Sequence, residues 1–103
     1  MIPPLKEKVE ELSQKAKDKG RSFSTVECRA EHMVIIVVGG IPAMFLVTEG
    51  KNQHTLFPMK VNLSKWAWAY EEGFKGQEIF ELFGEEIFTL TSETKILEYL
   101  KLD

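Results

Sequence analysis

Residues 33–47 read MVIIVVGGIPAMFLV, and this stretch decides the fold class. Two runs rich in β-branched and large apolar residues stand on either side of Gly39 and Gly40. Such runs favour buried strands, and a Gly-Gly pair can supply the positive φ angles of a two-residue hairpin turn. A membrane-spanning helix needs about 20 apolar residues without such a break. We therefore predict a hairpin of strands 32–38 and 43–48, and no membrane partner.

Further strands are predicted on both sides of this hairpin. Residues 22–29 (SFSTVECR) and 54–61 (HTLFPMKV) alternate in polarity, as strands with one buried face do. Pro58 has no N–H to donate to a ladder, so we expect its strand to lie at an edge of the sheet or to carry a bulge. Residues 86–90 (EIFTL) predict a short fifth strand.

Helical patterns occupy the two ends of the chain. Residues 4–19 repeat apolar side chains on one helical face, and Gly20 follows as a residue that readily ends a helix. Residues 93–102 form a second such pattern, preceded by Thr91 and Ser92 as caps. Between them, residues 77–83 (QEIFELF) predict a short helix that ends at Gly84.

Residues 64–72 (SKWAWAYEE) fit two different elements. In a strand, Trp66, Trp68 and Tyr70 share one face. In a helix capped by Ser64, Trp66 and Tyr70 lie one turn apart, whereas Trp68 points about 200° around the axis from Trp66. Alanine and glutamate favour the helix, but the pattern leaves both elements open. If the helix forms, one tryptophan is surplus to the core, and we expect it to be Trp68.

These elements give the order α-β-β-β-β-α-α-β-α in a single α+β domain over residues 1–103. We expect an antiparallel sheet of four to five strands with the N-terminal and C-terminal helices packed on one face. A chain of 103 residues, 44% of them apolar and with a net charge of −3, can form such a core without disulfides. The one cysteine, Cys28, has no partner for an internal disulfide.

Charge and the first residues indicate a cytoplasmic protein with no nucleic-acid partner. The start MIPPLKEKVEEL lacks the basic region and apolar run of a signal peptide. Residues 31–103 hold eleven acidic and six basic side chains, which makes this part of the chain acidic. The lysines of the first thirty residues are mixed with glutamates, as on a solvated helix face, whereas a nucleic-acid binder normally has a dense basic stripe to neutralise phosphates.

Residues 66–88 hold seven of the eleven aromatic side chains together with six glutamates. Most of these rings are expected to fill the core, but tryptophan and tyrosine also anchor many protein interfaces. An exposed tryptophan beside two glutamates suits a basic partner protein, or a second copy of the chain. We therefore predict a non-enzymatic, acidic protein-binding module of the adaptor, chaperone or inhibitor type, without a cofactor. Its predicted partner-binding residues are Trp66, Trp68, Tyr70, Glu71 and Glu72.

The alternative is a small ligand- or metal-binding protein, or an enzyme, centred on Cys28, His32 and His54. Cys28 and His32 flank a predicted turn, and His54 begins a strand two connections later. Zinc sites usually take three or four ligands from paired Cys or His motifs, and no such pair stands here. No nucleophile signature surrounds Cys28, and no phosphate-loop spacing follows Gly39 and Gly40. The pattern therefore favours the binding module over this alternative.

Overall fold

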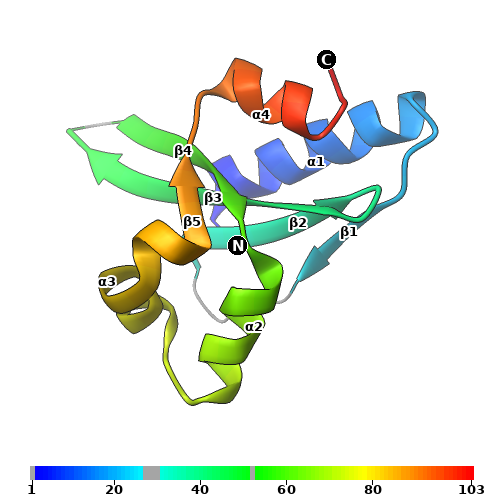
Figure 1. Cartoon of the computed structure of the whole chain (residues 1–103). Helices are drawn as coiled ribbons and strands as arrows, with labels where there is room; N and C mark the ends of the chain where they lie inside the picture. The colour runs from blue at the N-terminus through cyan, green and yellow to red at the C-terminus, as the bar shows by residue number, and fades with distance from the viewer. Residues whose placement is uncertain (1, 27–30, 52) are drawn as a thin grey trace.

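A computed structural model describes residues 2–26, 31–51 and 53–103 of the chain. The helices and strands in these ranges follow the predicted order and confirm the α+β class (Figure 1). In chain order they are α1 (Pro3–Asp18), β1 (Phe23–Val26), β2 (Met33–Val38), β3 (Ile41–Gly50), β4 (Gln53–Val61), α2 (Leu63–Glu71), α3 (Gly76–Ile87), β5 (Phe88–Leu90) and α4 (Glu93–Tyr99). None of the helices in the described ranges is long and apolar enough to cross a membrane.

The five strands form one sheet in the order β1-β2-β3-β4-β5, with each strand antiparallel to the next. The predicted central hairpin is confirmed. Val38 pairs with Ile41, and both intervening glycines have positive φ angles, 55° at Gly39 and 83° at Gly40. This turn lets a continuous run of buried residues fold back on itself at the centre of the sheet.

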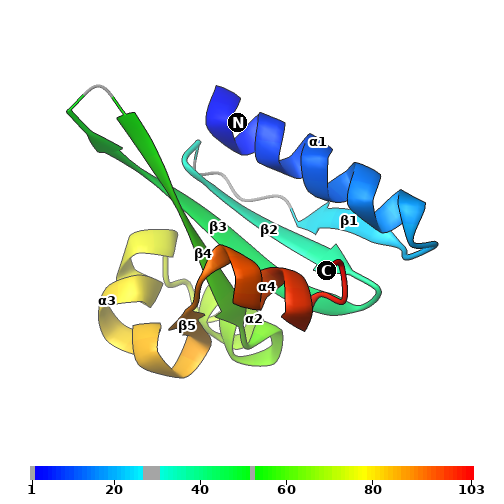
Figure 2. The same ribbon diagram turned by 90° about the horizontal axis from the view of Figure 1, so that it is seen from above.

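Helices cover both faces of the sheet (Figure 1). The N-terminal and C-terminal helices, α1 and α4, pack on one face as predicted, and Figure 2 looks onto that face of the sheet. The helices α2 and α3 pack on the opposite face. Alternate residues of β2 serve the two layers, since Val34 and Ile36 join the core under α1 whereas Met33 and Ile35 join the core under α2.

The expectation that the Pro58 strand is an edge holds for only part of β4. β4 pairs with β5 through Met59–Val61, and in the described part of the chain Gln53 to Phe57 pair with β3 alone. The Pro58 carbonyl accepts a hydrogen bond from the N–H of Thr91 at 3.2 Å. Backbone groups of one residue in an antiparallel strand point to the same side, so those of Pro58 face away from β3. The missing N–H therefore removes no bond between β3 and β4.

Gly84 does not end α3, contrary to the prediction. The helix continues to Ile87, which leaves only Phe88–Leu90 as strand β5. A glycine inside a helix costs about 1 kcal/mol relative to alanine. That cost is outweighed because the continued helix buries Ile87 against the sheet.

Two glycine substitutions should change stability in opposite directions. Gly84→Ala is expected to raise the free energy of unfolding by about 0.5–1 kcal/mol, because it improves a helix interior and the added Cβ meets nothing within 4 Å. Gly40→Ala has equal space but a φ of 83°, and should lower that free energy by about 1–2 kcal/mol. Urea unfolding followed by circular dichroism measures both. Destabilisation by Gly84→Ala would contradict the helical path of α3 through this residue.

Candidate functional site

Residues 63–71 form a helix, which settles the direction of the two tryptophans. The cap is Asn62, not the predicted Ser64, and its side chain accepts a hydrogen bond from the N–H of Lys65 at 3.2 Å. Asparagine is among the best N-cap residues. The helix turns Trp66 toward the sheet, where it is 9% exposed, and leaves Trp68 51% exposed. The expectation that Trp68 is the surplus tryptophan is confirmed.

The residues predicted to bind a partner do not form one continuous patch. Trp66 and Tyr70 stack on one flank of α2, with ring centroids 5.2 Å apart and planes 17° from parallel. Trp68 lies on the other flank and meets the ring of Phe83 edge-on at 5.7 Å. Trp68 therefore belongs to the surface shared with α3, together with the exposed Glu72 one turn later. Glu71 is also exposed.

Aromatic contacts hold α2 and α3 together and fasten α3 to the sheet. Phe83 also meets Phe74 edge-on, with centroids 5.1 Å apart. Phe80 stacks on Phe88 of β5 at 4.6 Å. Such pairs contribute about 0.5–1.5 kcal/mol each beyond the area that they bury. The rings predicted to fill the core thus fix the position of α3 against β5.

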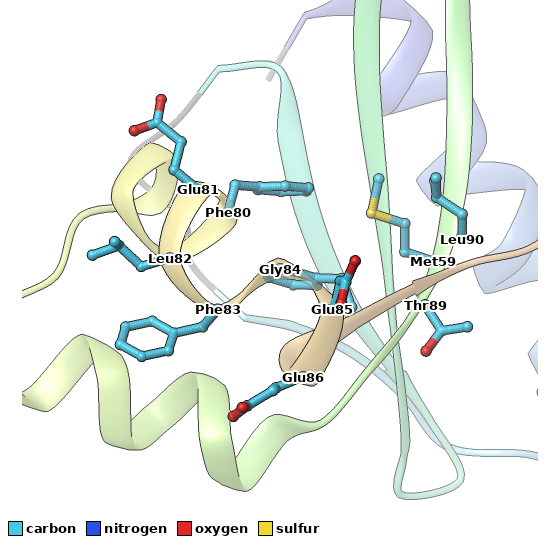
Figure 3. A pocket seen from close by; sticks show the side chains of 11 residues that line it. Met59, Phe80, Glu81, Leu82, Phe83, Gly84, Glu85, Glu86, Thr89 and Leu90 are labelled. Atoms are coloured by element: carbon cyan, nitrogen blue, oxygen red, sulfur yellow. The ribbon is translucent and has the colours of Figure 1, made fainter.

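An open hollow of about 770 Å³ lies between α3, β4 and β5 (Figure 3). Its apolar lining includes Met59, Phe80 and Phe88, and Figure 3 shows Phe80 pointing from α3 toward Met59. The glutamates Glu81 and Glu85 line it as well, and both are exposed. Sequence reasoning missed this hollow, because its walls come from segments whose spacing depends on how α3 packs.

Exposed large apolar side chains gather on the α2 and α3 side of the sheet. Leu82 is 63% exposed and Leu90 is 68% exposed, in addition to Trp68. Single exposed apolar residues are ordinary, whereas contiguous exposed apolar patches are common at interaction sites. Within the described ranges the remaining members of this class are Tyr70 on α2 and Phe57 on β4. Phe57 lies two residues before the buried Met59 in β4, so both side chains face the α2 and α3 side of the sheet.

The same side of the molecule carries the excess negative charge. Residues 62–92, which we call the acidic layer, comprise α2, α3, β5 and their connections and hold six glutamates and two lysines, for a net charge of −4. The whole chain has a net charge of −3, so the remaining residues sum to +1. One ion pair is described in the acidic layer, between Lys65 and Glu86 at 3.4 Å. Glu81 and Glu85 make no ion pair with the residues that the structure describes.

On the opposite side of the sheet, one ion-pair cluster is centred on Lys8. Lys8 of α1 bonds to Glu93 at 2.7 Å and to Glu11 at 2.9 Å. Burial lowers the pKa of Lys8, but the hydrogen bonds to the two glutamates and their negative charge together hold the pKa above its ordinary value. Lys60 lies 4.9 Å from the ring centre of Tyr99, whose pKa is raised by burial. These groups serve the packing of α1 and α4.

Of the three residues of the alternative metal site, the described ranges include His32 and His54. His32 and His54 are both exposed, His32 in the turn before β2 and His54 on β4. They lie on opposite sides of β3, because the N–H of Val47 donates to the His32 carbonyl and His54 pairs with Glu49. Two strand spacings amount to roughly 10 Å. Cys28 lies outside the described residues. In the described ranges no three His, Cys, Asp or Glu side chains come together as a metal site, and a site that includes Cys28 stays a prediction.

Comparisons with protein-family models, curated proteins and solved structures found no match.

Proposed function

We propose that this chain is a non-enzymatic protein-binding module whose acidic layer binds a basic partner with apolar anchor residues. One observation carries the proposal: the side of the sheet with the exposed Trp68, Leu82 and Leu90 also has a net charge of −4. Apolar anchors supply most of the binding energy in interfaces, whereas complementary charge raises the association rate and excludes wrong partners. As part of the same proposal, we place the module in the cytoplasm.

A different protein suits this surface better than a second copy does. In a two-fold dimer the same surface of both copies meets. The acidic layer would then place −4 against −4. Like charges brought together in an interface oppose association by several kcal/mol. A partner with lysine or arginine around an apolar residue avoids this repulsion.

Panning a random peptide library on the immobilised chain tests the chemical class of the partner. We expect the enriched peptides to combine Lys or Arg with large apolar residues. Glu85→Lys, at the hollow, should weaken their binding about fivefold, which corresponds to about 1 kcal/mol. The matched control is Glu98→Lys on α4, which makes the same charge change at an exposed site on the other face.

Fluorescence anisotropy with labelled peptides measures both dissociation constants, at low and at physiological salt. The control variant should change them by less than about twofold, since exposed charges beyond a Debye length are screened. Enrichment of peptides without basic residues would contradict the proposal. Equal weakening by Glu85→Lys and Glu98→Lys would contradict it as well, because the effect would then reflect total charge and not the acidic layer.

A further inference from the structure

We infer that the acidic layer takes its partner as an extended segment that adds antiparallel to the outer edge of β5. One apolar side chain of the segment enters the hollow, and basic side chains two residues away on either side meet the glutamates there. This inference rests on the proposed function and specifies how the partner is held.

The backbone of β5 has hydrogen-bonding groups that point away from the sheet. Thr89 pairs with Lys60, and the N–H of Thr91 donates to the carbonyl of Pro58 at 3.2 Å. Backbone groups of alternate residues in an antiparallel strand point to opposite sides. The N–H and C=O of Leu90, which lies between the two bonded residues, therefore point outward.

The outward groups of Leu90 are open to a partner strand. β5 is the last strand of the sheet. At its start, the N–H of Phe88 already donates to the carbonyl of Gly84 in the last turn of α3. Within the described ranges, the N–H and C=O of Leu90 make no such hydrogen bond, and the Phe88 carbonyl points to the same side. An open edge of this sort is a template for strand addition.

The side chain of Leu90 shows where an added residue would point. Leu90 and Phe88 lie on the same face of β5, the face that packs toward α3. A residue paired opposite Leu90 places its Cβ about 5 Å from that of Leu90 on the same face. Its side chain then enters the hollow near Met59 and Phe80. The hollow, at about 770 Å³, has room for a leucine or a larger side chain.

Charge determines the flanking residues. Side chains two positions before and after the apolar residue point to the same face of an added strand. They reach the side on which Glu81 and Glu85 are exposed without an ion pair among the described residues. The segment that fits is therefore basic, any residue, apolar, any residue, basic. An antiparallel direction continues the pairing of the whole sheet and lets one residue use both backbone groups of Leu90.

The test uses a blocked heptapeptide of sequence Thr-Lys-Thr-Leu-Thr-Lys-Thr and the ¹⁵N-labelled chain. In the proposed complex the N–H of the peptide leucine donates to the carbonyl of Leu90, whereas the N–H of the next threonine points to solvent. We expect saturable binding with a Kd below about 1 mM, a downfield shift of the Leu90 amide proton and slower exchange of that proton. Methylation of the leucine nitrogen should weaken binding at least about fivefold, but methylation of the next threonine nitrogen less than about twofold.

The outcomes separate this inference from the proposed function. If the peptide binds but both methylated forms bind equally and the Leu90 amide does not shift, strand addition is overturned. The proposed function then stands, with another docking mode such as a helix in the hollow. Absence of saturable binding up to about 1 mM overturns strand addition too. Peptide panning tests the proposed function separately, because enrichment of basic, apolar peptides does not depend on the conformation in which they bind.

Discussion

Trp66→Ala is expected to lower the free energy of unfolding by about 3–5 kcal/mol, and Trp68→Ala by about 1 kcal/mol. Trp66 is 9% exposed and belongs to the core under α2, so its removal leaves a cavity in addition to the lost transfer free energy. Trp68 is half exposed and loses mainly its edge contact with Phe83. Since a domain of this size is stable by only about 5–15 kcal/mol, the first loss is severe.

Urea unfolding of the two variants measures this difference, and each variant keeps one tryptophan as its own reporter. The fluorescence of Trp66 in Trp68→Ala should lie at shorter wavelength than that of Trp68 in Trp66→Ala, because the first indole is buried. Equal losses of stability would contradict the helix. They would indicate instead a strand in which both indoles share one face.

Phe45→Ala is expected to lower the free energy of unfolding by about 3–5 kcal/mol. Phe45 is fully buried in the middle strand of the sheet, in the core beneath α1 and α4. When a large core side chain is truncated, the surrounding structure relaxes only partly into the space and a cavity remains. For a domain near 100 residues, each kcal/mol corresponds to about 4–8 °C in Tm, so the variant should melt far below the parent.

The matched control is Phe57→Ala on the neighbouring strand. Phe57 is 37% exposed and faces the other side of the sheet, so its truncation should cost roughly 1 kcal/mol. Calorimetry of both variants checks the comparison. A loss in Phe45→Ala no greater than that in Phe57→Ala would mean that the core under α1 and α4 is not packed as the structure shows.

Much of the fold was accessible from local pattern. The period of apolar residues distinguishes helix from strand, and glycines mark turns, so the order of elements and the Gly39–Gly40 hairpin were predicted and confirmed. The same reasoning failed where a local signal competed with packing. Gly84 has poor helix propensity, but Ile87 gains burial when the helix continues through it. Propensity amounts to about 1 kcal/mol and burial of such a side chain to more.

Local sequence determined the identity of the elements and, once α2 is helical, the separation of Trp66 from Trp68. A helix advances by a constant angle per residue, so two residues two positions apart cannot share a face. Tertiary packing alone decided the rest. It placed α2 and α3 on the face opposite α1 and α4, brought Leu90 beside the hollow, and put the acidic layer where its exposed apolar groups meet its charge. Those relations join segments far apart in the chain, and no local propensity specifies the face on which an amphipathic helix docks.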